Sequence, residues 1–275
     1  MLNGSMDNQY KIVLNTFEEY KSLTRNQILN LFKFNYYAIV HHSSKIEGNT
    51  LTLEETEFLL DKNLTPKSKP LEDLLMVNDH YSALLYVIEL AKNKSKFDLN
   101  ELKNISSLLM KNSEKMVSNV LGITYASKGD LRLSNLRAGK TVFMNYDKVE
   151  SKVLQLLDYI SVNLNSKNFI EINKLAFLFH YQMVTIHPFL DGNGRLSRLV
   201  MNYVQQYHNI PLSYIYANDK LDYYKALNIT RENENLEIFY KFMFNQLNKQ
   251  LKAEIKHLKK QPKIKKNKKG FSLIF

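Results

Sequence analysis

Residues 187–198 read HPFLDGNGRLSR and join two segments of helical periodicity. Gly192 and Gly194 have no side chain, so backbone N–H groups there can approach an anion closely. The second helix is expected to start near Gly192, and a helix N-terminus favours negative charge. Arg195 and Arg198 are three residues apart, which places both on one face of the first turns of that helix. This stretch therefore predicts an anion site between two helices.

Two further side chains in this stretch suit chemistry on a bound phosphate. Asp191 offers hard carboxylate oxygens, which suit a Mg²⁺ ion that phosphates already hold. His187 can deprotonate a hydroxyl near neutral pH. Together with the arginines they predict a site for phosphoryl or nucleotidyl transfer. Each residue alone also fits a plain alternative, a glycine-rich turn beside a buried structural histidine, and it is the combination that favours the chemical interpretation.

Helical periodicity extends outward over most of the chain, and only 8 glycines and 5 prolines interrupt 275 residues. Thr24 is expected to cap a long helix that ends at Glu47 before Gly48, and Thr52 with Glu55 resembles a capping box. Further helices are expected near residues 12–20, 71–88, 98–111, 147–163, 170–186, 192–208, 219–230 and 235–260. One segment differs, because residues 128–146 alternate around Ala138-Gly139-Lys140 as a β-hairpin does. The prediction is an all-α fold with one hairpin.

The stretch 187–198 resembles the signature of the Fic family, HPFxxGNGRxxR, and matches all eight fixed positions. The resemblance implies a Fic-type helical domain with a β-hairpin flap and additional N-terminal helices. It also implies a protein adenylyltransferase that transfers AMP from ATP to a Ser, Thr or Tyr hydroxyl of a target protein. In such an enzyme His187 is the general base and Asp191 holds Mg²⁺. The implied nucleotide-binding residues here are Asp191, Gly192, Asn193, Gly194, Arg195, Leu196, Ser197 and Arg198, with Arg198 on the γ-phosphate.

Two other segments resemble elements of the same family. The hairpin resembles the flap that pairs with the target backbone, and residues 222–227 (DYYKAL) resemble a motif that lines the adenine pocket. The residues implied near the nucleotide are Leu136, Arg137, Ala138, Gly139, Tyr223 and Tyr224. The plain interpretations are an edge hairpin packed on helices and two unremarkable tyrosines in a chain that has 17.

A second motif lies at residues 43–49, which read SSKIEGN. Glu47 stands at a predicted helix C-terminus, where a negative charge is slightly unfavourable, and such a choice suggests a distant partner. The segment is similar to the inhibitory motif [S/T]xxxE[G/N] of Fic proteins. That resemblance implies that Glu47 pairs with Arg198 in the γ-phosphate position while Ser43 buttresses the helix. A second role also stays open, in which Glu47 positions water for removal of AMP.

The net charge of +11 invites a nucleic-acid interpretation, but most of it lies at one end. Residues 252–275 carry nine lysines and one glutamate, a net +8, which leaves +3 for the first 251 residues. Nucleic-acid binding through this tail therefore ranks last. Two functions rank between it and AMP transfer: a Fic enzyme that uses another nucleotide or donor, and an interaction scaffold with a Fic fold.

The chain has no cysteine, which excludes disulfides and thiolate chemistry. No apolar run approaches the ~20 residues of a membrane span, and the N-terminus lacks a secretory pattern, so we expect a cytoplasmic protein without membrane contact. Self-modification and a homo-oligomer are left open. The expected organisation is N-terminal helices over 1–66, a connecting helix over 67–97, a catalytic domain over 98–248 and a basic tail over 249–275.

Overall fold

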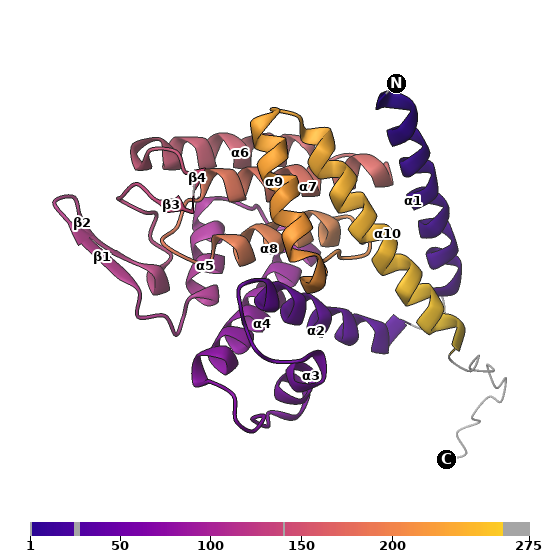
Figure 1. Ribbon diagram of the computed structural model, residues 1–275, viewed down its shortest axis with the longest axis horizontal. Coiled ribbons are helices and arrows are strands. Elements are labelled where there is room, and N and C mark those ends of the chain that lie inside the picture. Colours follow the sequence, from indigo (N-terminus) through magenta and orange to yellow (C-terminus); the bar gives the residue numbers. More distant parts are fainter. Residues whose placement is uncertain (1, 25–27, 140, 261–275) are drawn as a thin grey trace, which may run out of the picture.

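Helices make up most of the computed structural model, which describes residues 2–24, 28–139 and 141–260 (Figure 1). Within these residues the helices are α1 (Leu2–Thr24), α2 (Ile28–Ile46), α3 (Leu53–Lys62), α4 (Leu71–Lys92), α5 (Leu99–Leu109), α6 (Val149–Asn163), α7 (Phe169–Ile186), α8 (Asn193–Tyr207), α9 (Lys220–Glu232) and α10 (Leu236–Lys260). Short 3₁₀ turns are η1 (Ala126–Lys128), η2 (Tyr146–Lys148) and η3 (Ala217–Asp219). The predicted all-α fold is confirmed.

Local caps start two of these helices where the sequence predicts them. The Thr52 hydroxyl accepts a hydrogen bond from the Glu55 backbone N–H at 3.1 Å, and the Glu55 carboxylate accepts one from the Thr52 N–H at 2.8 Å. The capping box at the start of α3 is therefore confirmed. Asp98 caps α5 by accepting hydrogen bonds from the backbone N–H groups two and three residues ahead. Both signals depend only on neighbouring residues, which is why the sequence reveals them.

The helix boundaries around residues 25–27 differ from the prediction. Thr24 is the last residue of α1, so its predicted role as the N-cap of the next helix is wrong. A threonine at an N-cap has an extended backbone, whereas the backbone of Thr24 is helical. The start of α2 follows residues 25–27, which lie outside the described residues. Helix α2 ends at Ile46, so Glu47 lies just past its end, before Gly48 at φ 104°.

Two short antiparallel hairpins lie at one end of the helical body (Figure 1). The strands are β1 (Met116–Asn119) with β2 (Gly122–Tyr125), and β3 (Arg137–Ala138) with β4 (Thr141–Val142). The β3–β4 pair is the predicted hairpin, and Lys140 in its turn lies outside the described residues. The sequence pattern does not reveal the β1–β2 pair, because the exposed apolar residues Val120 and Leu121 stand together in its turn instead of alternating.

Helix α8 forms the centre of the fold and packs against α2, α4, α5 and α7. Every residue from Arg195 to Gln206 is buried, although several carry polar side chains. These polar side chains form hydrogen bonds inside the protein. For example, Gln205 Nε2 donates to Asn173 Oδ1 at 2.9 Å and to Ser213 Oγ at 2.6 Å. Because an unpaired buried polar group costs about 1–3 kcal/mol, such bonds hold α8 in one position. The N-terminus of α8 is therefore a fixed point.

The first and last described helices lie side by side along one edge of the molecule (Figure 1). The Tyr10 hydroxyl on α1 donates to the Glu237 carboxylate on α10 at 2.9 Å. Phe17 stacks on Phe169 of α7 with ring centroids 3.8 Å apart. Helix α1 therefore belongs to the same packed body as the later helices. Across the part of the chain that the structure describes, no helix is both long enough and apolar enough to cross a bilayer.

Helix α10 runs twelve residues into the segment predicted as a basic tail. Leu251, Ile255 and Leu258 are buried at helical spacing, so this end of α10 is packed against the fold. The predicted helix over 235–260 is therefore confirmed, and it includes the first residues of the predicted basic tail over 249–275. Of the nine lysines in residues 252–275, four lie on α10, and the other five lie in residues 261–275, outside the described residues.

Candidate functional site

The turn between α7 and α8 brings the predicted site residues to the N-terminus of α8. His187 ends α7 in the left-handed conformation, with φ 53°, and its N–H donates to the Met183 carbonyl at 3.0 Å. Gly192, at φ 75°, is the N-cap of α8. The Asn193 side chain bonds to both the N–H and the carbonyl of Phe189, at 3.0 and 2.8 Å. Because its amide shapes the turn, Asn193 can offer a ligand only its backbone N–H.

Both glycines of this turn provide space. A Cβ on Gly192 would lie 2.9 Å from Met110 Sδ, and the positive φ also disfavours a side chain there. A Cβ on Gly194 would collide with the Glu47 carboxylate, which lies over the first turn of α8. The first N–H groups of a helix lack partners within the helix and carry partial positive charge. The Glu47 carboxylate therefore marks the place where this helix accepts an anion.

Glu47 reaches this place from the end of α2 and pairs with Arg198. Arg198 Nη2 donates to Glu47 Oε1 at 2.5 Å, while Nε donates to Ser43 Oγ at 2.7 Å and Nη2 to the Ser43 carbonyl at 3.1 Å. Arg198 is 3% exposed, whereas the Glu47 side chain is 31% exposed. Burial alone would lower the pKa of Arg198, but the charge of Glu47 outweighs it and raises that pKa. The structure thus brings together the three residues that the inhibitory motif implies.

Other predicted residues of α8 are buried beside this place or in the core. Arg195 is buried, burial lowers its pKa, and its Nη1 donates to the Leu109 carbonyl at the end of α5 at 3.3 Å. The two guanidinium groups of α8 therefore diverge instead of sharing one face. Leu196 and Ser197 are buried in the core, and Ser197 Oγ donates to the Gly194 carbonyl at 2.7 Å. These two side chains lie on the core side of the helix, and their contact with a nucleotide stays a prediction.

The ring of His187 stacks against the β3–β4 hairpin. Phe143 lies on it with ring centroids 3.8 Å apart and an interplanar angle of 15°. Burial lowers the pKa of His187 to about 4, so its imidazole is neutral, and able to accept a proton, at neutral pH.

The four hairpin residues implied near the nucleotide lie in the β3 arm and the turn. Leu136 is half-buried, and the other three, Arg137, Ala138 and Gly139, are exposed. The hairpin that carries them contacts His187 through Phe143. Their contact with a nucleotide stays a prediction.

Asp191 lies just before α8, and its side chain is 46% exposed. Its Oδ1 accepts from the Gly192 N–H at 2.6 Å and its Oδ2 pairs with Lys115 Nζ at 3.0 Å. Burial opposes ionisation, but the contact with Lys115 and the Gly192 N–H lower the pKa of Asp191 overall. The carboxylate is therefore ionised and accessible.

The protein side chains in this region could bind a metal ion only together with a bound ligand that supplies further donor atoms. Nowhere in residues 2–24, 28–139 and 141–260 do three His, Cys, Asp or Glu side chains come together as a group that could hold a metal ion. One accessible carboxylate suits Mg²⁺, which keeps several waters and usually binds one or two carboxylates together with substrate phosphates. Asp191 thus matches a metal that arrives with a nucleotide.

The two adjacent tyrosines of α9 face different surroundings, since neighbouring residues of a helix point about 100° apart. Tyr223 is 1% exposed, and its hydroxyl lies 2.8 Å from His180 Nε2. Tyr224 is 38% exposed, and its pKa is raised by burial and then by the charge of Glu47. Tyr224 can therefore face a ligand at the anion site. The ring of Tyr223 belongs to the core, and its predicted place in the adenine pocket stays a prediction.

Comparison with known proteins agrees with the signature. The profile of the Fic/DOC family matches residues 96–205, which include α5, both hairpins and the turn from His187 to Arg198. Residues 96–205 therefore form a Fic/DOC domain.

Curated Fic relatives cover about three quarters of the chain. Protein adenylyltransferase fic-1 of Caenorhabditis elegans is 23% identical over 217 residues, which cover 77% of this chain and 40% of the relative. Protein adenylyltransferase Fic of Aedes aegypti is 28% identical over 202 residues, which cover 72% and 38%. The chain thus spans about two fifths of the length of these relatives.

Solved Fic structures share the fold. A Fic domain containing signaling protein from Bacteroides thetaiotaomicron superposes with a TM-score of 0.79 at 20% identity and covers 91% of this chain and 98% of its own. A fragment of Fic-1 from C. elegans gives a TM-score of 0.72 at 20% identity, with coverage of 93% and 73%. The likeness in fold therefore extends beyond the matched Fic domain to most of the helices before and after it.

Three residues near the site of this Fic domain give no clear signal in the sequence: Lys115, Arg132 and Phe143. Lys115 reaches Asp191 from the foot of β1, and Phe143 reaches His187 from the end of β4. Arg132 lies between the hairpins and is almost wholly buried. All three act through contacts far along the chain, so only the folded structure reveals them.

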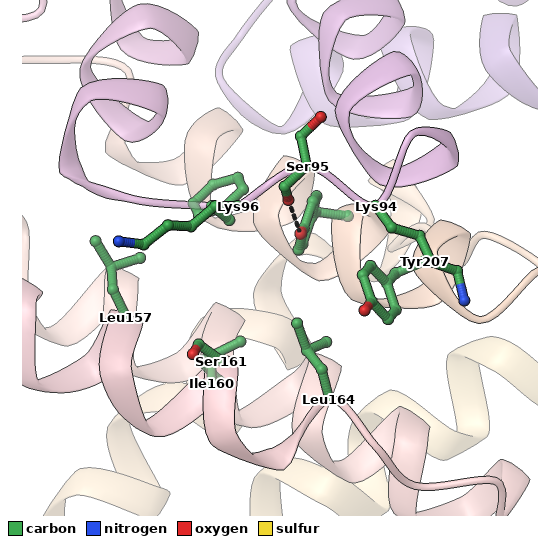
Figure 2. A pocket seen from close by; sticks show the side chains of 10 residues that line it. Lys94, Ser95, Lys96, Leu157, Ile160, Ser161, Leu164 and Tyr207 are labelled. Carbon is green, nitrogen blue, oxygen red and sulfur yellow. Dashed lines mark hydrogen bonds between the residues drawn. The ribbon is translucent and has the colours of Figure 1, made fainter.

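A separate cavity of roughly 170 Å³ opens at the other end of α8 (Figure 2). Lys94 and Lys96 stand at its rim, and apolar side chains of α6 form one wall. Tyr207 closes it, about 18 Å along α8 from Arg195 at 1.5 Å per residue. None of the predicted site residues lines it, so this cavity is separate from the turn between α7 and α8.

Proposed function

We propose that this chain is a protein adenylyltransferase that transfers AMP from ATP to a Ser, Thr or Tyr hydroxyl of a target protein. The observation that carries the proposal is the Glu47 carboxylate over the first turn of α8, beside the buried guanidinium of Arg198. An anion already lies in this place, and the same helix N-terminus and cation suit the phosphates of a nucleotide. The curated relatives, both named protein adenylyltransferases, support this reaction class.

His187 is the general base of the proposed reaction. Its neutral imidazole accepts the proton of the target hydroxyl while the hydroxyl oxygen bonds to the α-phosphorus of ATP. The bond from that phosphorus to the bridging oxygen breaks, and pyrophosphate leaves with its charge balanced by Arg198 and the helix N-terminus. Asp191 would hold Mg²⁺, which when bound neutralises further charge on the phosphates.

We also propose that the described arrangement is autoinhibited. The γ-phosphate of ATP and the Glu47 carboxylate compete for Arg198, since there is no room beside Gly194 for both anions. ATP then binds only with its α-phosphate out of line with His187. Removal of the Glu47 carboxylate frees Arg198 and lets the phosphates settle on the helix N-terminus.

Labelled ATP tests both proposals. Wild type, Glu47→Gly and the double variant Glu47→Gly/His187→Ala are incubated with Mg²⁺ and α-labelled ATP, alone and with a cell lysate. Glu47→Gly is expected to label itself or a lysate protein at least about tenfold more than wild type does, a gain of about 1.4 kcal/mol in transition-state stabilisation. The double variant is expected to label at background, because the general base is gone.

The position of the label separates the related reactions. Label in the γ-phosphate is expected to leave with pyrophosphate, so its transfer to protein would show phosphorylation instead. Equal labelling by wild type and Glu47→Gly would contradict the brake, and absence of transfer from ATP, GTP, UTP and CTP would contradict the transferase. Removal of AMP from a target already modified by Glu47→Gly, when wild type is added, would favour the role in which Glu47 positions water.

A further inference from the structure

We propose that Arg132 is a positioning residue that fixes the β3–β4 hairpin against the His187 turn and so aligns the target hydroxyl with the general base. This inference rests on the proposed AMP transfer and deepens it. Arg132 lies outside every motif that the sequence revealed, yet it is 1% exposed and is the largest of the fully buried side chains.

One guanidinium joins three separate pieces of the chain. Arg132 Nε donates to the His187 carbonyl at 2.8 Å, Nη1 to the Ser134 carbonyl at 2.7 Å, and Nη2 to the Met144 carbonyl at 2.5 Å. Ser134 precedes β3 and Met144 follows β4, so both legs of the hairpin are tied to the residue that carries the base. The Arg132 backbone N–H adds a fourth link, to the Pro188 carbonyl at 3.0 Å.

The electrostatics indicate a purpose beyond filling space. Burial lowers the pKa of Arg132, and no acidic side chain among the described residues offsets that effect. Burying a cation without a counter-ion is costly. The cost is offset by carbonyl oxygens, and those of Ile186 and His187 lie at the C-terminus of α7, the negative end of its dipole. Only a guanidinium offers enough donors in a rigid plane to reach three diverging carbonyls at once.

These links act directly on the geometry of the base. Phe143, the residue before Met144, stacks on the His187 ring. The guanidinium holds the backbone on both sides of this stack, at His187 and at Met144, so it fixes the position of the hairpin relative to the imidazole. A hairpin that slides by about 1 Å would misplace the hydroxyl, and a misplacement of that size can cost about 10²-fold in rate.

The test uses substitutions in the active Glu47→Gly background. Arg132→Lys keeps the charge but cannot reach three carbonyls, and we expect kcat for target labelling to fall at least about tenfold. The affinity for ATP, measured by calorimetry, is expected to change by less than about twofold, since the anion site lies on α8. Hydrogen exchange over residues 134–144 is expected to become faster, because the legs of the hairpin are released.

Gln250→Leu in the same background is the matched control. Gln250 is buried on α10 and its Nε2 donates to the Leu212 carbonyl at 2.7 Å, so its loss destabilises the protein without touching the hairpin. We expect a lower melting temperature with kcat retained. In Arg132→Ala, added guanidinium ion at millimolar concentration is expected to restore part of kcat, and to do nothing for Gln250→Leu.

The outcomes separate this inference from the proposed function. Full kcat in Arg132→Lys, or a loss of kcat that Gln250→Leu reproduces at equal loss of stability, would overturn the role of Arg132 while leaving AMP transfer in place. A loss of ATP affinity equal to the loss of kcat would also overturn it, since the effect would then lie at the anion site. Absence of AMP transfer by Glu47→Gly itself would overturn both.

Discussion

Arg198 donates to the hydroxyl and the carbonyl of Ser43 and to the carboxylate of Glu47, although it is almost wholly buried. A buried cation that loses its counter-ion keeps the cost of its burial. The partner carboxylate is partly exposed, so water can take its place and reduce that cost. Loss of the Glu47 carboxylate, which is proposed to release the brake, should therefore also weaken the fold.

We expect Glu47→Gly to lower the free energy of unfolding by about 1–3 kcal/mol, and Glu47→Gln, which keeps an acceptor, to lower it less. ATP with Mg²⁺ should raise the melting temperature of Glu47→Gly more than that of wild type, because the nucleotide supplies the missing anion. Thermal unfolding with and without nucleotide measures both effects. Glu114→Gly, which removes an exposed glutamate outside any helix or strand, is the control, and an equal loss of stability there would contradict the account.

The lowered pKa of His187 predicts a rate that is insensitive to pH in the neutral range. A histidine with a pKa of about 4 is neutral and active as a base well below its ordinary value of 6.5, and activity is lost only as the pH falls toward 4. Single-turnover transfer by Glu47→Gly should change by less than about twofold between pH 6 and 8. A half-maximal rate near pH 6.5, with the protein still folded by circular dichroism, would show that the base is not buried as described.

The sequence predicts which residue types gather at this site but not how each one points. His187, Asp191 and Gly192 form the turn as expected, because their spacing is local. Leu196 and Tyr223 point into the core, and that orientation depends on which side of a helix the rest of the protein covers. No pattern of neighbouring residues carries that information.

At the scale of elements, the site lies where the N-terminus of α8 meets the C-terminal ends of α2, α5 and α7. An arginine binds carbonyl groups at each of those ends: Arg198 on α2, Arg195 on α5 and Arg132 on α7. Cations at helix C-termini are stabilised by the dipole. Three negative helix ends thus hold the arginines in place around one positive helix end that binds the anion.

The capping box of α3 offers a test of whether the inhibitory helix depends on its neighbour. Thr52→Ala removes a cap and should lower the free energy of unfolding by about 1 kcal/mol. Helix α3 packs on α2 but contributes nothing to the Glu47–Arg198 pair, so self-labelling with ATP should stay at the wild-type level. Thr52→Ser, which keeps the hydroxyl, should match wild type in both measurements. Labelling as strong as that of Glu47→Gly would mean that α3 holds the brake.

Elements defined by neighbouring residues are predicted well, and those defined by distant contacts are not. The capping box and the Asp98 cap follow from residues three positions apart. The β1–β2 hairpin does not follow from its sequence, because it projects from the body and its apolar residues are exposed rather than alternating. The Lys115–Asp191 pair links the start of this hairpin to the site and joins residues 76 positions apart.

At the scale of the whole molecule, the first described helix packs on the last one. The Tyr10–Glu237 hydrogen bond spans 227 positions, and no local pattern could predict it. The same pairing packs residues 249–260, the end of the predicted helix over 235–260, against the first helix. Charge counts distinguish a basic segment from a neutral one, but they do not show that the apolar stripe of α10 continues beneath the lysines.

Truncation separates the helical part of this basic segment from the rest. A chain ending at residue 248 loses Leu251, Ile255 and Leu258 from the core and should lose several kcal/mol relative to a chain ending at residue 260, since each buried leucine or isoleucine contributes about 2–5 kcal/mol. Chemical unfolding of the two chains measures the difference. Equal midpoints would show that the last turns of α10 contribute nothing to the fold.

The Glu47–Arg198 pair also bears on how this chain would respond to selection. Both partners belong to one polypeptide, so dilution does not separate them. Any change that breaks the pair must supply another anion or leave the buried guanidinium without a counter-ion. Under the proposed autoinhibition, stability and turnover therefore depend on the same contact in opposite directions. Variants selected in the laboratory for stability at high temperature should lose labelling activity. Variants selected for labelling should lose thermal stability unless they gain compensating contacts elsewhere.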